Sequence, residues 1–98
     1  MRLTIIPSDG VVLIDGVLKL QPFDLSGCNV PANVHALQWY DTRGWIEFKD
    51  DADPFTPKEP NENIEALPAW AQACVQLWEA HPMPVPEVVE ITPRDPAA

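Results

Sequence analysis

Basic residues are scarce in this sequence. Six lysines and arginines stand against 15 aspartates and glutamates, which gives the 98-residue chain a formal net charge of −9. Binding to the phosphates of nucleic acids, or to anionic membranes, needs clustered lysines and arginines, so we expect neither partner. Generic solubility explains the acidity, and mimicry of DNA is the rarer alternative.

Long apolar runs and cysteines are scarce as well. No run approaches the ~18 residues of a membrane span, and the segment MRLTIIPSDG lacks the apolar stretch and cleavage site of a signal peptide. We therefore expect the protein to stay in a cytoplasm unless an assembly carries it out. Cys28 and Cys74 have no metal-binding or redox spacing, which predicts buried free thiols.

The sequence also lacks patterns of catalytic residues. Its only histidines are His35, expected beside apolar residues on a strand face, and His81, expected at the C-terminus of a helix. Ser8 and Ser26 lie in predicted turns, without the GxSxG context of a hydrolase nucleophile. These absences predict a protein that is not an enzyme and that has neither catalytic residues nor a cofactor.

One acidic stretch has part of the spacing of a calcium-binding loop. Asp51, Asp53 and Glu62 occupy its first, third and twelfth positions, but Phe55 and Thr56 take the fifth position and that of the glycine. Prolines also interrupt the stretch. We therefore interpret residues 50–63 as a solvated, acidic, proline-rich linker without a metal site, in which Phe55 is the one candidate for a contact with the sheet.

A hairpin over Val34–Phe48, VHALQWYDTRGWIEF, is the centre of the predicted fold. We expect its turn at residues 41–44 and Tyr40 opposite Trp45. Because side chains alternate along a strand, this register separates an apolar face from a polar one. The apolar set is Leu37, Trp39, Ile46 and Phe48, with His35 on the same side, and the polar set is Gln38, Glu47 and Lys49.

Three more strands are predicted before this hairpin. Residues 2–6 form the first, Val11–Ile14 the second and Val17–Leu20 the third. Asp15-Gly16 joins the last two, because both of these residue types accept the positive φ that a tight hairpin turn requires. About five strands in all are enough for an antiparallel sheet with one covered face, and residues 1–49 are predicted to form it.

The segment from residue 21 to 33 is predicted to be an irregular connection. Prolines and a glycine interrupt it and its side chains do not alternate. Phe23, Leu25 and Val30 are its candidates for core contacts, and Pro31–Asn33 is expected to form a single helical turn.

Residues 64–81 are predicted to contain an amphipathic helix, with Pro68 in its first turn and its end at His81-Pro82. Its apolar face consists of Leu67, Trp70, Ala71, Cys74, Val75 and Trp78, which recur at three- and four-residue steps. So short a helix is marginal alone in water. We expect it to pack on the apolar face of the sheet or on another chain.

Residues 82–98, PMPVPEVVEITPRDPAA, are predicted to be an extended proline-rich arm. Val88, Val89 and Ile91 are too apolar for a purely solvating tail, and they are expected to add as an edge strand to this sheet or to a partner's. The predicted fold class is therefore α+β and β-rich: a small antiparallel sheet of about five strands, one C-terminal helix and this arm.

Two blocks of the sequence resemble a known family. LTIIPSDGVVLIDG and VPANVHALQWYDTRGWIEFKD are similar to the pattern TIIPxDxxVxxDG…PxxVHAxQWY-turn-GxIEF of small proteins from tailed bacteriophages and prophages, over about Leu3 to Trp78. The arm lies outside this pattern. Such proteins are typically encoded near tail or tail-fibre genes, and the resemblance implies a tail protein or a tail-fibre assembly factor. It carries over no catalytic residue.

The predicted function is therefore that of a phage tail-associated interaction protein, located in the tail region of the virion or in the host cytoplasm during assembly. Its expected partner is a tail, baseplate or tail-fibre protein, with a homo-oligomer as a further option. Trp45 is either a structural cross-strand partner of Tyr40 or a contact residue. The candidate partner-binding residues are Tyr40, Trp45, Val85, Val88, Val89 and Ile91. The alternative function is an acidic inhibitor of a host nucleic-acid-binding defence protein.

Overall fold

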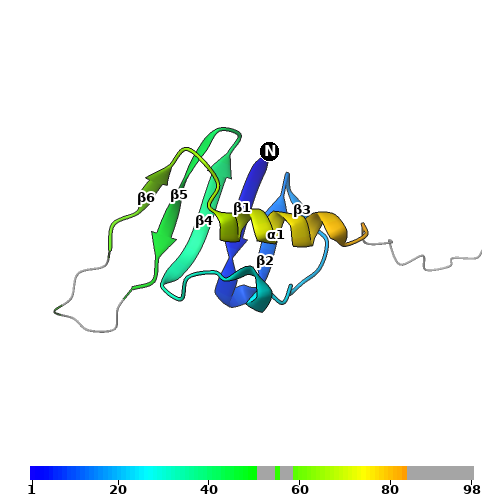
Figure 1. Cartoon of the computed structure of the whole chain (residues 1–98), viewed down its shortest axis with the longest axis horizontal. Helices are drawn as coiled ribbons and strands as arrows, with labels where there is room; N and C mark the ends of the chain where they lie inside the picture. The colour runs from blue at the N-terminus through cyan, green and yellow to red at the C-terminus, as the bar shows by residue number, and fades with distance from the viewer. Residues whose placement is uncertain (51–54, 56–58, 84–98) are drawn as a thin grey trace, which may run out of the picture.

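The computed structural model describes residues 1–50, 55 and 59–83. In this part of the chain six strands form one antiparallel sheet, in the order β3-β2-β1-β4-β5-β6, and the helix α1 lies across one face of it (Figure 1). The elements are β1 (Arg2–Ile6), η1 (Pro7–Asp9), β2 (Val11–Ile14), β3 (Val17–Leu18), η2 (Ser26–Cys28), β4 (Val34–Tyr40), β5 (Arg43–Phe48), β6 (Glu62–Ile64) and α1 (Ala69–Ala80). The predicted α+β class and antiparallel sheet are confirmed.

The N-terminal meander is present as predicted. β1 and β2 have the predicted bounds, and β2 pairs with β1 on one side and with β3 on the other. Asp15 and Gly16 have φ of 50° and 81°, the left-handed conformation that their turn requires. β3 ends at Leu18, two residues earlier than predicted, because the chain leaves this sheet edge there to cross to the other face.

The sheet has six strands, whereas the sequence predicted about five. The additional strand is β6, which pairs with β5 from Gly44↔Ile64 to Ile46↔Glu62. Its first two residues, Glu62 and Asn63, are polar and exposed. The strand therefore has the composition of the predicted linker. Pairing with the free edge of β5 outweighs its weak strand propensity. Phe55, the candidate linker contact, is 91% exposed and is therefore not buried against the sheet.

The central hairpin has the predicted faces but a different register. Leu37, Trp39, Ile46 and Phe48 are all buried. Tyr40, however, pairs with Arg43 and not with Trp45, which lies opposite Gln38. The reason is a tighter turn of only two residues, Asp41 and Thr42, in which Asp41 has a φ of 56°. Because the register differs by two residues, an even number, the side chains of the regularly paired part of the hairpin keep their predicted faces.

The prediction for His35 is wrong, and a β-bulge is the cause. The pairing of β4 with β5 shifts between Val34 and Ala36, so that His35 is an extra residue in β4. An extra residue interrupts the alternation of side chains. His35 is therefore exposed, whereas the residues before and after it in the sequence, Val34 and Ala36, are both buried.

The core lies between the sheet and a cover formed by α1 and residues 22–30. Phe23 and Leu25 are buried in this core and Val30 is partly buried against it, as predicted. Ala71 and Cys74 of α1 are fully buried, and the rest of its predicted apolar face is partly buried against the same core. The Trp78 Nε1–H donates to the Val17 carbonyl oxygen at 3.0 Å and so fixes the end of α1 to β3. The helix thus covers the apolar face of its own sheet.

Pro31–Asn33 form a turn closed by the Val34 N–H and the Pro31 carbonyl oxygen, and the one helical turn of this connection lies at η2. No helix in the described part of the chain is both long and apolar enough to cross a membrane. The candidate partner-binding residues of the arm, Val85, Val88, Val89 and Ile91, lie outside the described residues.

Candidate partner-docking face

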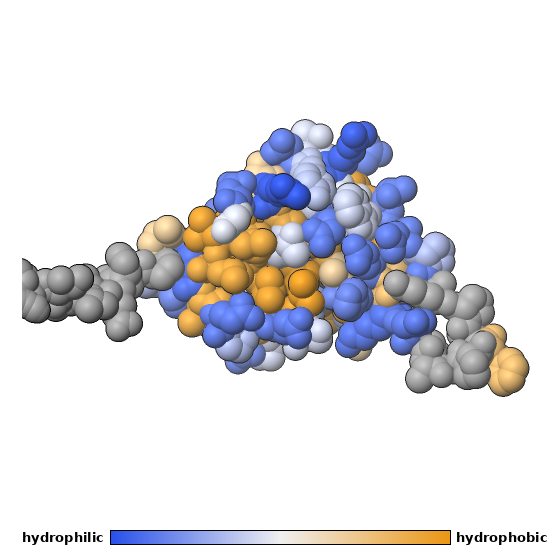
Figure 2. Space-filling view, turned by 180° about the vertical axis from the view of Figure 1, so that it is seen from behind, coloured by the Kyte–Doolittle hydropathy of each residue, from blue (hydrophilic) through white to orange (hydrophobic). Residues whose placement is uncertain are grey.

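The face of the sheet opposite α1, which we call the open face, has no helix or strand of the described residues over it (Figure 1). Figure 2 shows the molecule from this side. Side chains that alternate with the core residues point toward this face. One row of directly paired residues crosses it over all six strands: Leu18, Leu13, Thr4, Gln38, Trp45 and Asn63. Paired residues are neighbours on the same face, so the open face is one continuous surface.

On the open face, β3, β2 and the last residue of β1 form an apolar area. Ile6 pairs with Val11, and Leu13 pairs with Leu18; we call these four residues the apolar patch. Leu18 is 42% exposed and the other three are half-buried. Figure 2 shows an apolar area with a hydrophilic rim on this side of the molecule. A contiguous exposed apolar area of this kind is typical of an interaction site.

The rest of the open face carries two stacked aromatic rings. The rings of Tyr40 and Trp45 have their centroids 5.7 Å apart at an interplanar angle of 25°. Trp45 is partly buried, whereas Tyr40 is 39% exposed. We call this pair the aromatic platform. The two interpretations of Trp45 are compatible, because a ring that is stacked across strands on an open face is also available to a partner.

Hydrogen bonds fix the side chains of the platform and its surroundings. The Trp45 Nε1–H donates to Glu47 Oε2 at 2.8 Å, and the Thr4 hydroxyl lies 2.7 Å from Gln38 Oε1, to which it donates. On the other side of Tyr40 the Arg2 guanidinium lies 4.9 Å from the ring centroid, and its Nη2 is 3.3 Å from the Tyr40 hydroxyl. A surface ordered in this way loses less conformational entropy when a partner binds.

Two hollows lie on this surface. The larger, of about 760 Å³, extends from the platform to β6 and is lined by Tyr40, Arg43, Gly44, Trp45, Asn63, Ile64 and Glu65. The smaller, of about 270 Å³, is lined by Arg2, Thr4, Leu13 and Gly16 and so lies between Arg2 and the apolar patch. Together they give the open face the relief that a protein partner can fill.

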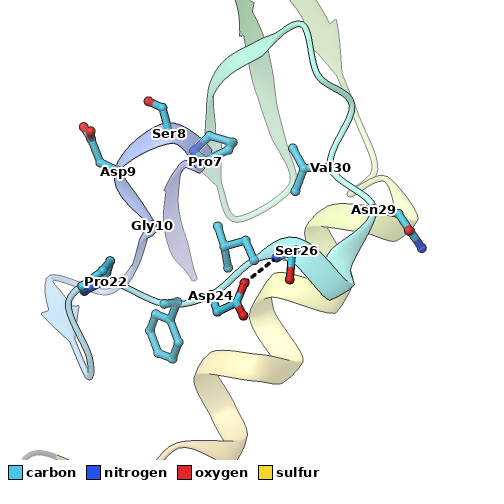
Figure 3. A pocket seen from close by; sticks show the side chains of 11 residues that line it. Pro7, Ser8, Asp9, Gly10, Pro22, Asp24, Ser26, Asn29 and Val30 are labelled. Atoms are coloured by element: carbon cyan, nitrogen blue, oxygen red, sulfur yellow. Dashed lines mark hydrogen bonds between the residues drawn. The ribbon is translucent and has the colours of Figure 1, made fainter.

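A third hollow, of about 720 Å³, lies where η1 meets the connection after β3 (Figure 3). Figure 3 shows Ser8 and Asp9 directed outward on one side and Asn29 on the other, so their polar groups do not converge. Asp24 accepts a hydrogen bond of 3.0 Å from the Ser26 N–H. Hydrogen bonds from the Ser26 side chain and backbone lower the pKa of Asp24. These groups therefore stabilise a local turn.

The cysteines and histidines have structural surroundings. Cys28 and Cys74 are both buried and free, as predicted. Burial raises the pKa of Cys74 to about 12, and the neighbouring Cys28 thiol contributes in the same direction, which disfavours the reactive thiolate. His81 follows α1, and its backbone N–H donates to the Trp78 carbonyl oxygen at 3.2 Å. Its imidazole ring lies edge-on to the ring of Phe23. No three His, Cys, Asp or Glu side chains among the described residues are grouped to hold a metal ion.

The structure brings together the two predicted contact residues of the hairpin, Tyr40 and Trp45, on a face that also carries residues that the sequence did not single out. Arg2, Arg43, Leu13, Leu18 and Asn63 all belong to the open face. Alternation within each strand was the available signal for their orientation. Which of them lie next to the platform depends on the strand order, which has no local signature in the sequence.

Comparison with known proteins gave no match: no protein-family model, no curated protein and no solved structure is significantly similar to this chain. The phage-family resemblance of the two sequence blocks therefore stays a prediction.

Proposed function

We propose that this protein is a phage tail-associated interaction protein that docks on a tail, baseplate or tail-fibre protein through the open face of its sheet. The observation that supports this proposal is the aromatic platform beside the apolar patch, on a face that no described element covers. Trp and Tyr are enriched among the residues that dominate binding energy in protein interfaces. The phage partner class rests on the sequence resemblance. The proposal assigns no catalysis and no cofactor.

Two forms of this function differ in whether the protein remains in the particle. A minor virion component is bound permanently near the baseplate or fibres, whereas an assembly factor binds fibre protein and is then released. Mass spectrometry of purified particles beside an infected-cell lysate separates the two forms. Stoichiometric presence in the particle identifies a virion component, and abundance in the lysate alone identifies an assembly factor.

To test the docking face, the tagged protein is purified from infected cells. The tail, baseplate and fibre proteins that copurify with it are then quantified. Trp45→Ala is expected to reduce their recovery about tenfold or more. Gln76 is exposed on α1, away from the open face. Gln76→Ala is therefore the matched control, and this variant is expected to bind like the unchanged protein. Recovery of these proteins that is independent of Trp45 would contradict the docking face, and recovery of none of them would contradict the function.

The alternative, an acidic inhibitor of a host nucleic-acid-binding protein, is supported by the net charge of −9. Such an inhibitor needs an acidic contact surface. The open face instead carries Arg2 and Arg43, so the surface with the best features for docking is not acidic. In the same experiment, enrichment of a basic host protein in place of tail proteins would favour the inhibitor.

Self-association through the open face would appear as a dimer mass in light scattering.

A further inference from the structure

Two arginines flank Tyr40 on the open face. Arg2 pairs with Tyr40 across β1 and β4, and Tyr40 pairs with Arg43 across β4 and β5. The three residues therefore form a straight row over three adjacent strands. Neighbouring strands lie about 4.8 Å apart, which puts the Cα atoms of the two arginines roughly 10 Å apart. Both arginines are exposed.

The position of these arginines is unusual for so acidic a chain. They are the only arginines among the described residues, and the whole sequence contains 15 acidic residues. Even so, the one ion pair in the described part of the chain joins the Met1 amino group to Asp41. The Arg2 guanidinium lies over the Tyr40 ring, and the Arg43 guanidinium has no hydrogen-bond or ion-pair partner among the described residues.

The carboxylates around this row are bonded to other donors. Glu47 accepts from the Trp45 indole, Asp15 accepts from the Arg2 backbone N–H at 2.8 Å, and Asp41 accepts from the Met1 amino group. Glu65 lines the same hollow as Arg43 without forming an ion pair with it. The neighbouring acids thus leave both guanidinium groups without a carboxylate.

We propose that the partner is an acidic segment of a protein, whose carboxylates bind Arg2 and Arg43 while its apolar side chains contact the aromatic platform and the apolar patch. This inference rests on the proposed function and names the chemistry of its partner. Guanidinium groups bind carboxylates through two parallel hydrogen bonds. Arg, Trp and Tyr together are the residue types most enriched at interface hot spots.

The charge distribution favours a short acidic segment over a polyanion. A nucleic acid presents phosphates along its whole length and interacts with the field of the entire chain, which is strongly negative. A segment with a few acidic residues among apolar ones interacts mainly with the two local arginines, because salt screens charges beyond about 8 Å. The smaller hollow, between Arg2 and Leu13, connects the charged row to the apolar patch.

The test uses two synthetic peptides, acetyl-Glu-Val-Glu-Val-Glu-amide and its matched control acetyl-Gln-Val-Gln-Val-Gln-amide. Each is titrated into isotope-labelled protein while the side-chain N–H signals of Arg2, Arg43 and Trp45 are followed by NMR. The Glu peptide is expected to shift all three signals and to bind about tenfold or more tightly than the Gln peptide. Its affinity is expected to fall as salt is added.

Charge-removing variants locate the binding. Arg43→Gln and Arg2→Gln are each expected to weaken binding of the Glu peptide about tenfold. Lys49→Gln removes the same charge from an exposed residue after β5 and is expected to leave the affinity for the peptide nearly unchanged. Equal binding of the two peptides, no binding of either, or an equal loss with Lys49→Gln would overturn the inference. The proposed function fails separately: if Trp45→Ala abolishes recovery of tail proteins and the arginine variants do not, the docking face stands without its acidic partner.

Discussion

The two faces of the sheet are built from alternating residues of the same strands, yet they have different surroundings. On β1, Leu3 and Ile5 are fully buried, whereas Arg2, Thr4 and Ile6 point to the open face. α1 and the connection after β3 complete the inner face from within the chain. The open face has features of an interface, and in our proposal another molecule completes it. In this proposal one face of the sheet stabilises the fold and the other binds the partner, because alternate residues of each strand point to opposite faces.

The largest expected effect of a substitution belongs to the inner face. Trp39 is 6% exposed, and Trp39→Ala is expected to lower the free energy of unfolding by about 3–5 kcal/mol through lost burial and a cavity. In a domain this small that loss can unfold the protein. Denaturant unfolding followed by circular dichroism measures it. A loss below about 1 kcal/mol would mean that the inner face is not the stabilising one.

A glycine tests how closely the strands pack on the inner side of the hairpin. A Cβ at Gly44 would lie 2.8 Å from the Trp39 Cα and closer still to the Gln38 carbonyl oxygen. Gly44→Ala is therefore expected to lower the unfolding free energy by about 1–3 kcal/mol. Gly27→Ala is the matched control, because a Cβ there meets nothing within 4 Å. Equal melting temperatures for the two variants would contradict this close approach.

Thiol reactivity sharpens the contrast between the faces. The pKa of Cys74 is raised from 9.0 to about 12, chiefly by burial, so iodoacetamide is expected to label it only after unfolding. Leu18→Cys places a thiol at an exposed position of the open face and is expected to react readily in the folded protein. Mass spectrometry of alkylated protein reads out both. Rapid labelling of Cys74 in the folded protein would show that α1 detaches from the sheet.

The raised pKa of this thiol also gives stability a pH dependence. Folding favours the protonated thiol, so this contribution is complete below the unfolded pKa near 9.0 and is lost as the pH rises toward about 12. Cys74→Ala removes this dependence along with some packing. Unfolding curves of the two proteins between these limits are therefore expected to differ in their slope with pH.

The smallest expected effect on stability belongs to the open face. Trp45→Ala removes a stacked ring pair worth about 0.5–1.5 kcal/mol and is expected to leave the protein folded. Its effect on recovery of a tail protein is expected to be much larger than its effect on the melting temperature. If Trp45→Ala unfolds the chain as Trp39→Ala does, the platform is part of the fold and not a docking surface.

Much of the fold could be predicted because the signals were local. The turn-forming residues that follow β1 and β2 gave these strands their ends, alternation gave the hairpin its two faces, and Asp15-Gly16 identified a tight turn. β6 could not be predicted, because Glu62 and Asn63 are poor strand formers and only the free edge of β5 makes them pair. His35 could not be placed, because a bulge changes the face of a residue without changing the pattern around it.

The candidate site was predictable only where it lies within one hairpin. Tyr40 and Trp45 are close in sequence, and alternation put them on one face. Arg2 is beside Tyr40 because β1 lies between β2 and β4 in the sheet, and a strand order of this kind is decided by the packing of the whole domain. The row of Arg2, Tyr40 and Arg43 therefore becomes visible only in the folded chain.

The two outer strands of the sheet are very short. β3 has two residues and β6 has three, so neither offers the long row of free backbone groups that lets sheets join edge to edge. Association of sheets edge to edge can repeat without limit and leads to fibres. A sheet face, in contrast, has no room for a second molecule once one partner covers it. A protein with edge strands this short is suited to complexes of fixed stoichiometry and not to edge-joined fibres.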